Sequence, residues 1–217
     1  MSAAGWYDLT RPIYAGMPVY PGDPDVTVQT QADYDPDGYL TSVWRMGSHT
    51  GTHVDAPKHF LTDGIGTDRL PLDALIGTAH LADVRQRGKN AEITAADLAA
   101  ALPCRRLLIC TGWDERWGRD DYYTHPPGLS ASAVNAVIAA GVRLLGFDTP
   151  NIHATEWARR HQALLGSGVV LVEALYGLTR LLPAQRAYLV VAPLLLRNSD
   201  GAPARVFARI DANLESE

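Results

Sequence analysis

Cysteine is scarce in this chain: Cys104 and Cys110 are the only two in 217 residues, and they form no C-x-x-C pair. This scarcity excludes a disulfide framework and a zinc site built on paired cysteines. Cys110 lies in the apolar run of residues 107–110, so we expect a small buried hydrophobic side chain there. Both observations are consistent with a reducing compartment.

Clusters of positive charge and long hydrophobic runs are also lacking. The formal net charge is −5 and the basic residues are scattered, so no basic stripe suits a phosphate backbone. The first residues show no basic region followed by an apolar one, and the apolar run at 188–196 is short and interrupted by Pro193. We therefore expect a cytoplasmic protein that binds neither nucleic acid nor membrane.

The composition fits a single globular domain over residues 1–217, because 47% of the residues are hydrophobic and 20% are charged. Prolines oppose a long helix in the first 45 residues, and β-branched and aromatic residues there favour strands at 26–30 and 39–46. Later in the chain, capping residues and apolar runs predict helices at 94–102, 130–140 and 155–165 and strands at 106–110, 142–147, 169–172, 188–192 and 205–210. This alternation predicts a mixed α/β domain.

The most informative segment is residues 49–60, which contains three imidazoles and one carboxylate: His49, His53, Asp55 and His59. In a straight strand these odd-numbered positions share one face, but His49 and His53 would lie roughly 13 Å apart, too far to share an ion. The backbone must therefore bend between them, and Gly51 permits such a bend. We predict a strand that leads into a sharply bent loop with Gly51 at the bend.

Neutral imidazole and carboxylate are usual ligands of zinc, manganese and iron. One ion held by His49, His53 and Asp55 would keep an open position for water, which is the catalytic pattern. His59, two residues after Pro57, would be either a further ligand or a general acid/base.

A carboxylate can bridge two ions, so Asp55 leaves room for a second metal with ligands from elsewhere in the chain. Among later residues Glu173 stands out, because it ends an apolar strand where an unpartnered charge would cost several kcal/mol. The other candidates for this role are His80, His125, His153, His161 and Asp148.

Residues 49–60, written H-x-G-T-H-x-D-x-P-x-H-F, resemble the signature of the metal-dependent cyclase family, which includes the bacterial kynurenine formamidases and isatin hydrolase. Further segments resemble the family in order: residues 18–24, 111–113 and 146–150, His161 with Glu173 twelve residues later, and residues 200–205. The resemblance therefore extends over most of the chain.

The resemblance implies a mixed barrel-like α/β fold and a homodimer or higher assembly. It implies that one ion is held by His49, His53 and Asp55, and a second by Asp55, His161 and Glu173. It also implies that His59 is the catalytic acid/base and that N-terminal aromatic residues contribute to the substrate pocket.

Two residues depart from the family pattern. Tyr20 stands where the formamidases typically carry Trp, and Asn151 stands where Ser is usual. The Trp position is associated with the aromatic substrate. Tyr20 can still stack on a ring and adds a hydroxyl, so we expect it to contact an aromatic or heterocyclic substrate.

Three functions fit these residues. The first is a metal-dependent hydrolase of the arylformamidase type, which cleaves a formamide or a related linear or cyclic amide by means of water activated by one or two divalent ions, Zn²⁺ or Mn²⁺. The alternative is a biosynthetic cyclase or lactone-processing enzyme that uses the same metal site. The third, a non-catalytic metal-binding protein, agrees less well with five ligand candidates beside an acid/base.

Overall fold

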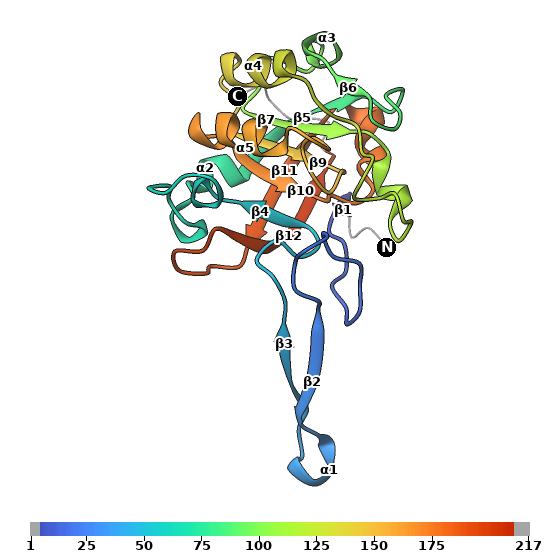
Figure 1. The fold of residues 1–217 in the computed structure, drawn as a ribbon, viewed down its shortest axis with the longest axis vertical. Helices are drawn as coiled ribbons and strands as arrows, with labels where there is room; N and C mark the ends of the chain where they lie inside the picture. Colours follow the sequence, from blue (N-terminus) through green and yellow to red (C-terminus); the bar gives the residue numbers. More distant parts are fainter. Residues whose placement is uncertain (1–4, 211–217) are drawn as a thin grey trace.

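A ring of seven strands organises the computed structural model, which describes residues 5–210. Figure 1 shows the arrangement of the elements. The strand order is β12-β11-β5-β7-β9-β10-β4, and pairing of β4 with β12 closes the ring. These strands are β4 (His53–Asp55), β5 (Ile76–Asp83), β7 (Arg106–Cys110), β9 (Leu144–Phe147), β10 (Val170–Glu173), β11 (Arg186–Pro193) and β12 (Gly201–Arg209). Strands β5, β7, β9 and β10 pair in parallel and the other pairs are antiparallel, so the barrel is mixed.

The remaining elements attach to this barrel. The other strands are β1 (Trp6–Asp8), which pairs with β12, the paired β2 (Thr27–Ala32) and β3 (Thr41–Arg45), and the paired β6 (Glu92–Ile93) and β8 (Gly128–Leu129). The helices are α1 (Tyr34–Asp37), α2 (Leu72–Leu75), α3 (Ala95–Leu98), α4 (Ala131–Ala139) and α5 (Trp157–Gly166). Short 3-10 helices are η1 (Pro57–His59), η2 (Thr67–Arg69), η3 (Trp113–Arg116) and η4 (Leu178–Ala184). Across residues 5–210, no helix has the length and apolar character needed to cross a membrane.

Alternation along the parallel strands divides the core into two layers. Leu108 and Cys110 of β7 pack in the cluster that fills the barrel, whereas Leu107 and Ile109 pack outward with residues of α4 and α5. The same alternation in β10 places Val170 and Val172 inside and Leu171 outside. Helices α4 and α5 therefore cover the outer face of the parallel strands.

Local sequence explains where the helices begin and end. Ser130 caps α4, because its hydroxyl accepts a hydrogen bond from the Ala133 N–H, and Gly141 follows the helix with a φ of +71°. The backbone N–H of Thr94 donates to the Asp97 carboxylate at 2.7 Å, as the capping pattern predicts. Helix α3 nevertheless ends at Leu98 and not near residue 102, because the chain turns before Pro103.

The mixed α/β fold expected from the sequence is confirmed, and so are most of its predicted strands. Five strands were not predicted: β1, β4, β6 and β8, each of two or three residues, and the eight-residue β5, which matters more for the barrel. The β2–β3 hairpin projects away from the barrel as an arm with α1 at its tip (Figure 1).

Candidate metal centre

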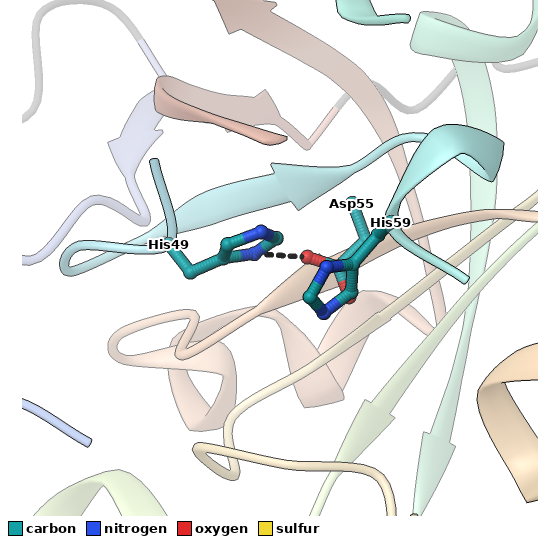
Figure 2. Close-up of side chains that lie close together, drawn as sticks. All are labelled: His49, Asp55 and His59. Carbon is teal, nitrogen blue, oxygen red and sulfur yellow. Dashed lines mark hydrogen bonds and ion pairs between the residues drawn. The ribbon is translucent and has the colours of Figure 1, made fainter. Parts of the chain in front are cut away.

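The bend predicted at Gly51 is present. Gly51 has a φ of +64° and lies between the turn that contains His49 and strand β4, whose first residue is His53. Pro57 then starts η1, so β4 is only three residues long. The bend folds His49 back onto Asp55, and its Nδ1 lies 2.8 Å from Asp55 Oδ1 (Figure 2).

Strand pairing brings the late carboxylate to this segment. Glu173 lies opposite His53 in the antiparallel β4–β10 pair, and residues that lie opposite each other share a face. That face is the outer one, because Leu171 opposite Asp55 packs outward. His161 on α5 covers the same face, and its Nε2 lies 3.3 Å from Asp55 Oδ2 and 3.2 Å from Glu173 Oε1.

Five side chains thus form what we call the imidazole–carboxylate cluster: His49, His53, Asp55, His161 and Glu173. All but His49 are buried. Donor atoms of neighbouring members lie 2.8 to 3.7 Å apart. Two ligands bound to one ion at about 2.1 Å are separated by about 3.0–3.4 Å in octahedral or tetrahedral geometry, so the cluster fits a divalent metal in both donor chemistry and spacing.

Two of the imidazoles are held in the orientation that a ligand needs. His53 Nδ1 lies 2.9 Å from the Gly51 carbonyl oxygen, and His161 Nδ1 lies 2.7 Å from the Trp157 carbonyl oxygen. An N–H on each Nδ1 donates to that carbonyl, so Nε2 is the nitrogen that faces the carboxylates, and its lone pair is available to a metal once the ring is neutral. Phe60 stacks on the His161 ring at a centroid distance of 4.7 Å, which further fixes that ring.

Asp55 is the electrostatic centre of the cluster. Burial alone would raise the pKa of Asp55, but hydrogen bonds with His161, His49 and His53 hold it well below its ordinary value. Burial would lower the pKa of His49 and of His161. Hydrogen bonds and negative charge from Asp55 and Asp200 nevertheless raise the pKa of His49 to about 9. Those from Asp55 and Glu173 raise the pKa of His161 to about 10. Burial and the negative charge of Asp55 raise the pKa of Glu173. In the absence of a metal, protons on His49 and His161 therefore balance the buried carboxylates.

His59 lies beside the cluster and differs from it electrostatically. Its ring centroid lies 4.0 Å from that of His49, with the two rings tilted by 34°, and its Nδ1 lies 3.7 Å from Asp200 Oδ2. Burial is the main reason that the pKa of His59 is lowered to about 4; the charge of Asp55 opposes this shift, and the positive charges of His49 and His161 add to it. His59 also lies close enough to His49 and Asp55 to share an ion with them (Figure 2), so the geometry accommodates both roles considered for it.

Two residues of the site were not identified from the sequence, Asp200 and Gly201. Asp200 Oδ2 lies 3.0 Å from His49 Nε2, and Gly201 lies opposite Asp55 in the β12–β4 pair. A Cβ on Gly201 would lie 2.6 Å from the His49 ring, so only glycine allows this imidazole to pack there. The sequence feature that could have indicated them is the Asp-Gly pair at residues 200–201. The pair follows His49 by about 150 residues and reaches it only because β12 pairs with β4 and closes the barrel.

The other candidates lie outside the cluster. His80 Nδ1 lies 2.9 Å from the Ala101 carbonyl oxygen, and His125 and His153 bond to residues next to them in sequence. Asp148 accepts hydrogen bonds from the backbone N–H groups of Thr111 and Gly112, and burial raises its pKa to about 7. These four residues hold their own loops and strands and do not face the metal centre.

A cavity of about 220 Å³ opens beside the cluster. Four aromatic residues that also line the cavity contact one another edge to face; we call Tyr20, Trp117, Tyr122 and Tyr123 the aromatic wall. Tyr20, which was expected to contact substrate, therefore faces the same cavity as the cluster. A cavity with an aromatic wall and a polar, metal-binding side suits a small planar molecule with one reactive polar group.

Comparison with known proteins agrees with this architecture. The family model described as putative cyclase matches residues 7–154. A kynurenine formamidase from Salinibacter ruber is 31% identical over 210 residues, covering 93% of this chain and 96% of that protein. The structure of isatin hydrolase A from Labrenzia aggregata bound to benzyl benzoate superposes with a TM-score of 0.86 at 27% identity, covering 94% of this chain and 93% of that one. A potential metal-dependent hydrolase with cyclase activity superposes with a TM-score of 0.79 at 29% identity, covering 95% and 98%.

The closed mixed barrel, the imidazole–carboxylate cluster and the adjoining cavity define an enzyme of the metal-dependent hydrolase class. More particularly, the chain belongs to the cyclase family, as its sequence signature indicated.

Proposed function

We propose that this protein hydrolyses a formamide or a related linear or cyclic amide attached to an aromatic or heterocyclic ring, with Zn²⁺ or Mn²⁺ at the imidazole–carboxylate cluster. The observation that carries the proposal is the convergence of five buried or half-buried ligand candidates on one side of an aromatic-lined cavity. A bound divalent ion supplies the acidity that makes water nucleophilic near neutral pH, and it polarises the amide carbonyl. The likeness to kynurenine formamidases and to isatin hydrolase A supports an amide as the substrate.

Within the proposal, His49, His53 and Asp55 hold one ion, and Asp55, His161 and Glu173 hold a second where two are bound. Asp55 suits the shared position because it is the one residue that contacts all three imidazoles of the cluster. Each imidazole must lose its proton to bind an ion, so the protons that balance the carboxylates leave when metal enters.

His59 is the proposed acid/base. Burial lowers the pKa of His59, which favours a neutral imidazole near pH 7, and its partly exposed side chain lines the cavity. A neutral imidazole nitrogen accepts the proton of the attacking water and passes it to the leaving nitrogen. Asp200, 3.7 Å from His59 Nδ1, stabilises the ring while it is positively charged.

The direct test combines elemental analysis of protein purified without added metal with a panel of N-formyl anilines, cyclic amides and lactones. We expect a divalent metal in the purified protein and turnover of at least one amide that disappears with chelation. Turnover of lactones alone, or ring closure without hydrolysis, would instead favour the alternative of a lactone-processing enzyme or biosynthetic cyclase.

We further propose that the protein is a homodimer in which the β2–β3 arm contacts a second copy of the chain. Large side chains are exposed along this arm, including Tyr39, Val43 and Trp44, and a two-stranded hairpin in water is marginally stable by itself. A groove of about 480 Å³ that includes Ile13 and Leu194 offers an apolar counterpart on the same chain. An arm and a groove on each copy permit a two-fold symmetric exchange.

Light scattering coupled to size-exclusion chromatography tests the assembly. We expect a dimer for the native protein and a monomer for Val43→Asp. Leu72→Asp is the matched control, because Leu72 is an exposed apolar residue on α2 and not on the arm. A monomeric native protein, or equal dissociation by both substitutions, contradicts this interface.

A further inference from the structure

Tyr20 and Asn151 contact each other at the cavity. They are 131 residues apart in sequence, yet Asn151 Nδ2 donates a hydrogen bond to the Tyr20 hydroxyl oxygen at 3.3 Å. Both residues line the cavity beside the metal centre. They therefore form one local feature of the substrate site.

The hydrogen bond with Asn151 leaves the Tyr20 hydroxyl free to act as a donor. An amide NH₂ is only a donor, so the Tyr20 oxygen accepts and its own hydrogen is not used in this contact. The Asn151 amide is oriented by the His153 N–H, which donates to Asn151 Oδ1. Within residues 5–210 the Tyr20 hydroxyl has no acceptor, so its O–H is available to a molecule in the cavity.

The Tyr20 ring is held in place by its neighbours. It packs edge to face against Tyr123 at 5.7 Å, and the Tyr123 hydroxyl donates to the Pro18 carbonyl oxygen two residues before Tyr20. The donor is therefore fixed in position before substrate binds, which reduces the entropy lost on binding.

Charge in the cavity selects among possible acceptors. Among the described residues that line it, none is Lys or Arg, whereas Asp23 contributes a carboxyl group. The Arg11 guanidinium lies 4.1 Å from the Trp117 ring centroid and donates to the Asp114 carbonyl oxygen, so it does not line the cavity. The lining groups that can carry positive charge are the imidazoles at the metal centre, which the proposed function assigns to the metal and to proton transfer. A carboxylate near Tyr20 would share the cavity with the Asp23 carboxyl group, whereas a neutral carbonyl needs only the hydroxyl donor.

We infer that the Tyr20–Asn151 pair is a specificity determinant that donates one hydrogen bond to a neutral acceptor, such as a ketone or amide carbonyl, on the ring of the substrate. The inference rests on the proposed amide hydrolysis and narrows its substrates to aryl amides that carry such an acceptor. Tyr20 orients the substrate and takes no part in the proton transfers assigned to His59.

The test compares formanilides that carry an acetyl, an isopropyl or a carboxylate group at the ortho, meta or para position. Acetyl and isopropyl groups have similar shapes, and only acetyl accepts a hydrogen bond. At one of the three positions we expect the native enzyme to prefer acetyl, and we expect Tyr20→Phe to reduce the acetyl-to-isopropyl ratio of kcat/KM by about 3- to 10-fold. Intrinsic differences in leaving-group reactivity cancel when the native ratio is divided by that of the variant.

Tyr122→Phe is the matched control, because it removes from the same wall a buried hydroxyl that has no hydrogen-bond partner among residues 5–210. We expect Tyr122→Phe to keep the native ratio and Asn151→Ser to lower it in the same direction as Tyr20→Phe. Equal ratios for the native enzyme and Tyr20→Phe, or a native preference for the carboxylate, would overturn the inference.

A binding experiment separates the proposed amide hydrolysis from the proposed role of Tyr20. It measures by calorimetry the binding of acetylaniline and isopropylaniline, the amine products, to the zinc-loaded protein. If the native enzyme hydrolyses none of the amides, amide hydrolysis fails, and the ratio of product dissociation constants still decides the role of Tyr20. If it hydrolyses them with a ratio that Tyr20→Phe leaves unchanged, only the specificity inference fails.

Discussion

The imidazole–carboxylate cluster and the aromatic wall face the same cavity but are built in different ways. Four of the five cluster members stand on paired strands or a helix, whereas His49 lies in a turn; they are fixed by backbone carbonyls, by Phe60 and by one another. The aromatic wall stands on connecting segments between these elements. Rigid elements hold the groups that must keep a metal geometry, while loops carry the groups that select the substrate. Substitutions in the imidazole–carboxylate cluster should therefore reduce the reaction rate for every substrate. Substitutions in the aromatic wall should instead change which substrates are preferred.

The largest effect is expected for Asp55→Asn, because Asp55 is the carboxylate common to all three cluster imidazoles. We expect loss of bound metal and a fall in kcat/KM of about 10³-fold or more. Asp148→Asn is the control, since Asp148 is equally buried but bonds to Thr111 and Gly112. Metal analysis and amide turnover of both variants check the prediction, and it fails if Asp55→Asn keeps its metal and its rate.

His59→Ala separates proton transfer from metal binding at the edge of the cluster. We expect this variant to retain metal while kcat falls by about 10²- to 10⁴-fold, the usual range for a lost acid/base. Metal content and kcat measured on one preparation check this. Near-native turnover would remove the proposed role, and loss of metal would assign His59 as a ligand.

Gly201→Ala tests whether the cluster depends on packing from β12. A methyl group there would lie 2.6 Å from the His49 ring, so the ring must shift, and we expect metal affinity to fall by about 10- to 100-fold. Gly166→Ala is the control, because a Cβ at Gly166 of α5 meets nothing within 4 Å. Competition with a metal indicator measures both affinities. Equal affinities would show that His49 tolerates displacement.

A smaller effect is expected in the pH dependence of the metal-free protein. Its folded state keeps protons on His49 up to about pH 9 and on His161 up to about pH 10, whereas unfolded histidine titrates near 6.5. This contribution to stability is complete below pH 6.5 and is lost as the pH rises through 9 to 10. We expect the Tm of chelated protein to fall by about 5 °C or more between pH 6.5 and pH 9.5.

The metal-loaded protein is the control for that experiment, because ligand imidazoles are neutral and do not contribute in this way. Its Tm should change less over the same range. A metal-free Tm that rises with pH would contradict the assignment of protonated imidazoles to the cluster.

The residues of this site that could be predicted from the sequence are those that lie close together in the chain. His49, His53, Asp55 and His59 lie within eleven residues, so spacing alone indicated a metal site and a bend at Gly51. His161 and Glu173 were ranked above other candidates only through the family resemblance. The structure supplies the physical reason that sequence reasoning lacked: β4 pairs antiparallel with β10, and α5 packs over both.

The unpredicted part depends on long-range closure. Asp200 and Gly201 reach His49 only because β12 pairs with β4, and no local pattern encodes that pairing. Strand β5 was missed because Gly77 and small residues interrupt alternation, although the strand is buried on both faces between β11 and β7. The contact between Tyr20 and Asn151 likewise joins two loops that only the barrel brings together.

The most direct test of the account is titration of chelated protein with Zn²⁺ and, separately, Mn²⁺, with hydrolysis of an N-formyl aniline followed at each addition. The account predicts no turnover without metal and a rise in turnover that saturates at one or two ions per chain. Full turnover in metal-free protein, or saturation of the cluster with metal and no hydrolysis of any amide in the panel, would contradict it.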